Sequence, residues 1–95
     1  MLTGKQKRYL RSLAVNEKAL VQIGKDGITD NLVMSIREAL KSHELVKIAI
    51  HKGCELSINE LVIDILANTQ SDLVQTIGKT IVIYKPAKER KIILP

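Results

Sequence analysis

Two glycines that flank a lysine and an aspartate are the residues whose types and spacing best suit a chemical task in this chain. They lie in the stretch VQIGKDGIT, residues 21–29, where a short apolar run ends and a helix is predicted to begin. Glycine lets the backbone turn tightly and approach a ligand without a Cβ in the way. A helix start adds unpaired N–H groups and the positive end of a dipole, which together suit a phosphate. Lys25 and the loop amides would contact the phosphate, and the residues of this candidate binding loop are Gly24, Lys25, Asp26, Gly27 and Thr29.

The first predicted helix, residues 5–14, supplies a second set of candidate phosphate ligands. Thr3 and Gln6 stand three residues apart before it, as a capping box requires. On a helical wheel its apolar side carries Gln6, Tyr9, Leu10, Leu13 and Ala14. The opposite side carries Lys5, Lys7, Arg8 and Arg11. Because the helix dipole disfavours positive charge in the first turns, a helix selected only for stability would carry acidic residues there. We therefore interpret the basic side as a binding surface, although such a side can also be merely solvated.

Length and composition bound the class of protein. A chain of 95 residues fits one domain, 1–95, and is long enough to bury a core without a disulfide or a metal. The single cysteine, Cys54, cannot form an internal bridge and fits a reducing compartment. The start of the chain has no apolar signal core, and no apolar run approaches the length that spans a membrane. We expect a soluble, cytoplasmic protein with no membrane partner.

The net charge of +5 is concentrated at both ends of the chain. Residues 1–25 carry six Lys or Arg against one Glu, and residues 73–95 carry five against one, whereas the middle is mildly acidic. Such polarity favours an anionic partner, and nucleic acid is the first candidate. The simpler alternative is that the charge only keeps the protein in solution.

The remaining pattern predicts strands over 19–23, 44–51, 73–77 and 80–85, and helices over 30–42 and 58–68. Thr29 should cap the first of these helices, and the pair Ser57 and Glu60 should cap the second. Strand, helix and strand in succession imply a parallel crossover, and Gly78-Lys79 suits a two-residue hairpin turn. The basic tail, about 87–95, also holds an apolar stretch at 92–94, so we expect it to dock on the domain.

The chain resembles the CRM domain, the chloroplast RNA splicing and ribosome maturation domain, and most closely its free-standing bacterial form, the YhbY family. The matching blocks span nearly the whole chain in the family's order. They are LTGKQ at 2–6, YLR at 9–11, VQIGKDGIT at 21–29, HELVKI at 43–48, LVQTIG at 73–78 and IYKP at 83–86. One departure is Asp26, which stands where family members often carry a second basic residue.

The resemblance implies a compact α/β domain of order α-β-α-β-α-β-β, with a mixed four-stranded sheet packed by three helices. It implies similarity to the C-terminal domain of bacterial translation initiation factor three. It also implies RNA binding through the Gly-x-x-Gly loop and the basic first helix. Stand-alone bacterial members are linked to precursors of the large ribosomal subunit, so the expected target is structured ribosomal RNA during pre-50S maturation.

The aromatic content limits how RNA could be recognised. The chain has no Phe or Trp, and its only aromatic side chains are Tyr9 and Tyr84. Single-stranded RNA is usually read by stacking bases on exposed rings, so recognition should rest on phosphates and shape instead. Tyr9 shares the apolar side of the first helix and is predicted to pack in the core. For Tyr84 the sequence leaves core and surface equally open.

An enzyme has little support in this sequence. His43, His51 and Cys54 are its only His and Cys residues, too few for a structural zinc site, and no Walker loop is present. We expect no catalysis, no metal, no cofactor and no small-molecule substrate, and nothing demands more than a monomer. The main rival to RNA binding is an assembly factor that acts by protein–protein contacts, with the apolar stretch 92–94 as its docking element.

Overall fold

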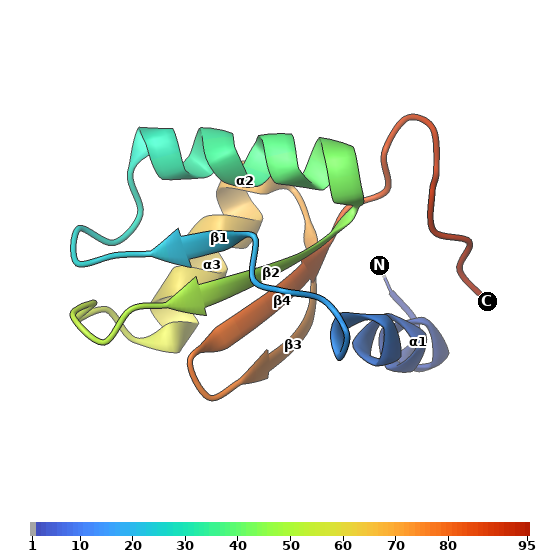
Figure 1. Cartoon of the computed structure of the whole chain (residues 1–95), viewed down its shortest axis with the longest axis horizontal. Coiled ribbons are helices and arrows are strands. Elements are labelled where there is room, and N and C mark those ends of the chain that lie inside the picture. Colours follow the sequence, from blue (N-terminus) through green and yellow to red (C-terminus); the bar gives the residue numbers. More distant parts are fainter. Residues whose placement is uncertain (1) are drawn as a thin grey trace.

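A four-stranded mixed sheet carries helices on both of its faces (Figure 1). The structure, a computed structural model, describes residues 2–95. Its elements follow the predicted order, which confirms the expected α/β architecture. They are α1 (Gly4–Ala14), β1 (Val21–Ile23), α2 (Asp30–His43), β2 (Leu45–Ile50), α3 (Ile58–Thr69), β3 (Asp72–Ile77) and β4 (Thr80–Tyr84).

The strands lie in the order β1-β2-β4-β3. The pair β1–β2 is parallel and is connected through α2, as the strand–helix–strand pattern predicts. The other two pairs, β2–β4 and β4–β3, are antiparallel. Gly78 and Lys79 form the hairpin turn between β3 and β4, and Gly78 has a φ of +53°, in the region that favours glycine.

Side-chain caps place the starts of all three helices where the sequence predicts them. The Thr3 hydroxyl accepts from the Gln6 N–H at 3.1 Å, and the Gln6 carboxamide accepts from the Thr3 N–H at 3.0 Å. Ser57 and Glu60 make the same reciprocal pair at the start of α3. Each cap satisfies amides that the helix itself leaves unpaired, so it fixes where the helix begins.

One face of the sheet packs against α2 and α3 and holds the larger core. Successive residues of a strand point to opposite faces, so Val46 and Ile48 of β2 lie on this side. The other buried members are Val21, Ile23, Ile36, Leu40, Leu61, Ile65, Ile81 and Ile83. Because α2 and α3 are amphipathic, their apolar stripes cover this face and leave their charged sides in water.

The opposite face packs against α1 and the C-terminal tail. Its buried members are Leu10, Ala14, Leu45, Val74, Val82 and Tyr84. Leu2, Leu13, Ile92 and Leu94 are partly buried against them. The tail therefore docks on the domain, as predicted, and it does so beside α1.

A buried carboxylate holds the tail in place. Glu44 ends α2, has no exposed surface, and accepts N–H groups from Ala87 at 2.9 Å, from Ile92 at 2.8 Å and from Lys91. Its own carbonyl accepts from the N–H of Lys85 at 2.9 Å. Its φ of +61° lies in a region costly for a residue with a Cβ, which such a set of contacts can stabilise.

The ionised form of Glu44 is the one that these contacts favour. Burial alone would raise the pKa of this carboxyl, but the three amides and the charge of Lys91 lower the pKa below its usual value of 4.5. A carboxyl with a depressed pKa stabilises the fold above its unfolded-state pKa. That stabilisation is lost as the pH falls through the folded-state pKa.

We predict that Glu44→Gln lowers the free energy of unfolding at pH 7 by about 1–3 kcal/mol, because one amide of the tail then faces an NH₂ group instead of an oxygen. Urea unfolding between pH 7 and pH 3 measures this. The wild type should lose stability below pH 4.5, and the variant should lose less over that range. Glu89→Gln, which neutralises an exposed carboxyl of the same tail, is the control. Equal unfolding curves for wild type and Glu44→Gln at both pH values would contradict the anchoring role.

Candidate nucleic-acid interface

The glycine loop is a tight turn that presents its charged residues to solvent. The N–H of Gly27 donates to the carbonyl of Gly24 at 3.1 Å and closes a four-residue turn. Lys25 and Asp26 occupy the tip of this turn, and both are exposed. Such a turn accepts most residues at its centre and favours glycine at its fourth position.

The two glycines of the loop have different roles. Gly27 has a φ of +69°, and a Cβ added to it would lie 2.9 Å from Cδ1 of Leu56, in the loop before α3. Gly27 is therefore required by the backbone itself. Gly24 has no positive φ, and a Cβ added to it would meet no atom within 4 Å. Neither the backbone φ nor the surrounding atoms therefore require glycine at position 24.

Thr29 acts as a helix cap. Its hydroxyl accepts from the N–H of Leu32 at 3.1 Å, and its carbonyl accepts from the N–H of Val33 at 3.0 Å. It positions the first amides of α2 instead of offering a free acceptor. Asp30 then follows in the first turn, so together with Asp26 it places two carboxylates beside the single charge of Lys25. The loop alone is not a strongly positive site.

Two further loops lie beside the glycine loop. The N–H of His51 donates to the carbonyl of Ile23 at 2.8 Å, and the N–H of Ile50 donates to the carbonyl of Lys79 at 2.8 Å. These bonds gather the loop after β1, the loop after β2 and the β3–β4 turn at one end of the sheet (Figure 1). We call residues 24–29, 51–57 and 78–79 the loop end.

The loop end collects cations that are far apart in the sequence. Lys52 and Lys79 are both exposed and join Lys25 there. Gly53 lies beside Lys25, because a Cβ added to Gly53 would come within 3.8 Å of the Lys25 Cβ. The N–H of Gly53 also donates to Nδ1 of His51 at 3.0 Å, which orders the second loop. Sequence reasoning did not include His51 and Lys52 in the site and left Lys79 undecided. The parallel pairing of β1 and β2 was the signal, because it brings the loops after both strands to one edge.

The basic side of α1 lies at the other end of the molecule. Lys5, Arg8 and Arg11 are exposed, Lys7 is half-buried, and the Arg11 Nε donates to the carbonyl of Val74 at 3.4 Å. Figure 1 shows α1 beside the two chain ends, far along the long axis from the loop end. The structure therefore does not bring these cations next to the glycine loop.

An open part of the sheet lies between α1 and the loop end. Strand β2 runs from Leu45, which packs against α1, through Lys47 to Ala49 and then into the loop end. Ala49 pairs with Gln22 of β1 and with Thr80 of β4, and Thr80 pairs with Ile77. Each of these four residues is at least partly exposed, and Ile77 is 62% exposed. This row runs across the strands and lies between α1 and the loop end on one face of the sheet.

The structure contradicts the prediction for Tyr9 and decides between the two alternatives for Tyr84. Tyr9 is 39% exposed, so the prediction that it packs in the core is wrong. The face of α1 that contacts the sheet is centred on Leu10 and Ala14, and Tyr9 lies beyond the edge of that contact. Tyr84 is buried, and its hydroxyl has no hydrogen-bond partner among residues 2–95. Burial and the nearby Glu44 carboxylate raise the pKa of Tyr84.

Residues 2–95 contain neither a metal-binding cluster nor a membrane-spanning helix. No group of three or more His, Cys, Asp or Glu side chains in this range could hold a metal ion. None of its helices combines the length and the apolarity needed to cross a membrane.

Known proteins resemble this chain over nearly its whole length. A family model for the CRS1 / YhbY (CRM) domain matches residues 2–85. The chain belongs to the CRM domain family. The "Probable RNA-binding protein YqeI" of Bacillus subtilis is 47% identical over 91 residues, which cover 96% of this chain and 95% of the relative. An "RNA-binding protein" of Haemophilus influenzae is 38% identical over 95 residues, which cover 99% of this chain and 95% of the relative.

The fold of this CRM domain also matches a solved structure. The solution structure of SAV1595 from Staphylococcus aureus, named there as a candidate RNA-binding protein, superposes with a TM-score of 0.84 and 47% sequence identity. The match covers 100% of both chains. Both the expected family and the expected fold are thereby confirmed.

The two glycines of the loop allow a prediction that separates folding from binding. Gly27→Ala should lower the free energy of unfolding by about 1 kcal/mol, because the φ is unfavourable for alanine while the exposed Leu56 side chain can move aside. Gly24→Ala should leave unfolding unchanged and weaken RNA binding, because the added methyl group blocks the approach of a phosphate. Thermal unfolding and RNA titration of both variants measure this. Unchanged RNA affinity in Gly24→Ala would mean that the Gly-x-x-Gly loop is only a structural turn and not an RNA-binding site.

Proposed function

We propose that this protein binds structured ribosomal RNA of large-subunit precursors and so assists pre-50S maturation, as a monomer in the cytoplasm. Membership of the CRM domain family and relatives named as RNA-binding proteins support RNA as the partner. The observation that carries the binding site is the convergence of Lys25, Lys52 and Lys79 at the loop end, beside the first amides of α2.

The loop end would hold the RNA backbone by charge and by amides. Exposed lysines provide most of the salt-dependent affinity for phosphates, and backbone amides at a helix start fix the position of one phosphate. Lys52 and Lys79 raise the number of lysines at the loop end to three, against the carboxylates of Asp26, Asp30 and Glu55. Binding there would depend on where the lysine side chains lie and not on a net positive charge.

The cations of α1 would contact the same RNA farther along. The molecule is 37 Å long, so an RNA that touches both the loop end and α1 must extend over on the order of ten nucleotide steps of about 3.4 Å. The open row of the sheet between the two regions leaves this path free of helices. Such a span favours a folded RNA over a short single strand. The exposed ring of Tyr9, on the same helix, offers one position for stacking a base.

The rival function, assembly by protein contacts through the apolar tail, has less support from the packing. Ile92 and Leu94 lie against the core beside α1, and Ile93, at 85% exposed, is the side chain of that stretch that stays in solvent. A single apolar side chain is a small docking element. We therefore propose a binding role through RNA and not a catalytic one.

Lys25→Gln, Lys52→Gln and Lys79→Gln should each weaken binding to a structured large-subunit RNA fragment by about three- to tenfold at 100 mM salt. Each should also lower the slope of log affinity against log salt by about 0.7–0.9, because each loses one phosphate contact. A titration at several salt concentrations measures both quantities. Lys18→Gln removes the same charge from an exposed site outside the loop end and should have a smaller effect.

A DNA duplex of equal length distinguishes RNA recognition from general attraction to polyanions. The RNA should bind more tightly than the DNA at every salt concentration. Equal affinity for both polymers, together with equal effects of Lys18→Gln and the three loop-end variants, would overturn the proposed site.

A further inference from the structure

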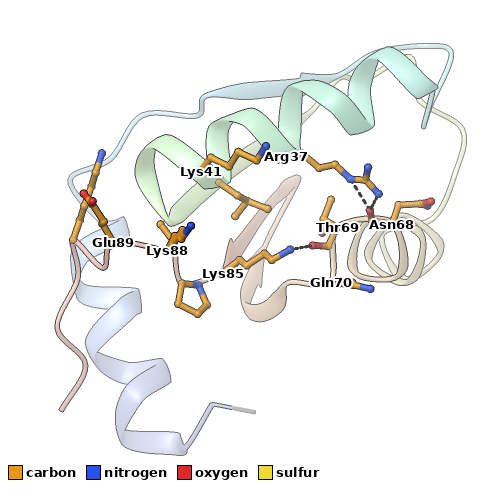
Figure 2. Close-up of a pocket in the computed structure, with 12 residues that line it drawn as sticks. Arg37, Lys41, Asn68, Thr69, Gln70, Lys85, Lys88 and Glu89 are labelled. Carbon is orange, nitrogen blue, oxygen red and sulfur yellow. Dashed lines mark hydrogen bonds between the residues drawn. The ribbon is translucent and has the colours of Figure 1, made fainter.

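A basic cavity lies on the α2–α3 side of the sheet, away from the loop end. Its volume is about 790 Å³, and it is bounded by the C-terminal parts of α2 and α3 and by the chain from Lys85 to Lys91 (Figure 2). A single carboxylate, Glu89, lines it. Its five cationic side chains are Arg37, Lys41, Lys85, Lys88 and Lys91.

Three of these cations cap the carbonyl ends of helices. Arg37 donates from Nε and Nη2 to the carbonyl of Asn68 at 3.0 and 2.7 Å, and Lys85 donates to the carbonyl of Thr69 at 3.0 Å. Lys91 donates to the carbonyl of Ser42 at 2.6 Å. These bonds satisfy carbonyl groups that would otherwise repel an anion. A guanidinium carries five N–H donors and an ammonium three, so each of these cations keeps donors to spare.

The other two cations have no such role. The side-chain ammonium groups of Lys41 and Lys88 make no hydrogen bond within residues 2–95, and both residues line the cavity, one from α2 and one from the tail (Figure 2). A cation in the last turn of α2 is favourable for that helix, which accounts in part for Lys41. Lys88 lies outside any helix, so that explanation does not extend to it.

The wall that carries Lys88 is fixed in place. Ala87 and Lys91, two residues that line the cavity, donate their N–H groups to the buried carboxylate of Glu44. Lys85, which also lines the cavity, donates its backbone N–H to the carbonyl of Glu44. The cavity is thus formed before any ligand arrives, which lowers the entropic cost of binding.

We propose that this cavity is a second anion site, which binds a phosphate group through Lys41 and Lys88 with support from the spare donors of Arg37 and Lys85. Its volume lies in the range of pockets that hold a nucleotide-sized ligand. The phosphate can belong to an RNA backbone or to a free nucleotide. This site goes beyond the RNA contacts proposed above, because it lies on other elements than the loop end and shares no residue with it.

The test uses the full chain with the double variant Lys41→Gln/Lys88→Gln. Neither side chain makes a hydrogen bond within residues 2–95, so thermal unfolding should change only slightly, through the loss of the Lys41 charge in the last turn of α2. Two probes are titrated separately, ATP and the structured large-subunit RNA fragment, while amide chemical shifts are followed by NMR. With at least one probe, wild-type shifts should appear at Lys41, Gln70 and Lys88, and the double variant should bind at least fivefold more weakly.

The matched control is a variant that should raise the affinity for the probe instead of lowering it. Glu89→Gln removes the one carboxylate that lines the cavity and should tighten binding of the same probe by about two- to threefold. Lys25→Gln, at the loop end, should leave the cavity shifts unchanged.

The two probes identify the source of the phosphate. Shifts with RNA alone assign the site to a backbone phosphate, and shifts with ATP below about 1 mM assign it to a free nucleotide. Absence of cavity shifts with both probes, or equal affinity of the double variant, overturns the proposal. If the double variant binds both RNA and ATP like the wild type while the loop-end variants bind RNA more weakly, the cavity proposal fails and the proposed function stands.

Discussion

The buried carboxylate of Glu44 is the interaction on which the arrangement of the domain depends. It ends α2, precedes β2, and binds the chain that leaves β4 through three amide donors. A carboxylate without exposed surface is stable only when hydrogen bonds replace its hydration. Here the tail supplies those bonds, so the position of the tail and the charge of Glu44 depend on each other. The packing of the tail against α1 and one wall of the basic cavity both follow from this arrangement.

The distribution of helices over the two faces of the sheet determines where charged side chains remain accessible to a ligand. Helices α2 and α3 pack over one face of the sheet, where Arg37 and Lys41 of α2 join the cations of the tail around the cavity. Helix α3 itself carries no Lys or Arg. The other face is covered by α1 in part, and an open row of strand residues continues toward the loop end. The basic residues near the start and end of the sequence are thus divided among the loop end, the outer side of α1 and the cavity. The charge of each region alone is modest, which favours a large polyanion that reaches more than one of them.

Local signals in the sequence were sufficient to predict the helices and strands. They were not sufficient to predict the environment of individual side chains. The capping pairs Thr3/Gln6 and Ser57/Glu60 act over three residues, so spacing alone predicts them. The burial of Tyr84 and the exposure of Tyr9 depend on how α1 crosses the sheet, which no local pattern encodes. The contribution of Lys52 and Lys79 requires the pairing of three strands. No local pattern marks Glu44 as a buried anchor, because its partners lie more than forty residues away in the chain.

The docking of the tail beside α1 has a consequence for how this domain could be joined to other polypeptides. The Gln6 carboxamide donates to the carbonyl of Pro95 at 3.4 Å, and Leu2 and Leu94 pack on the same apolar cluster. The chain thus enters and leaves at one pole, while the loops occupy the other (Figure 1). Adjacent ends allow a unit to be inserted into a longer protein or repeated in tandem with little strain. An affinity handle attached at either end would likewise leave the loops accessible, and immobilised protein would present them outward.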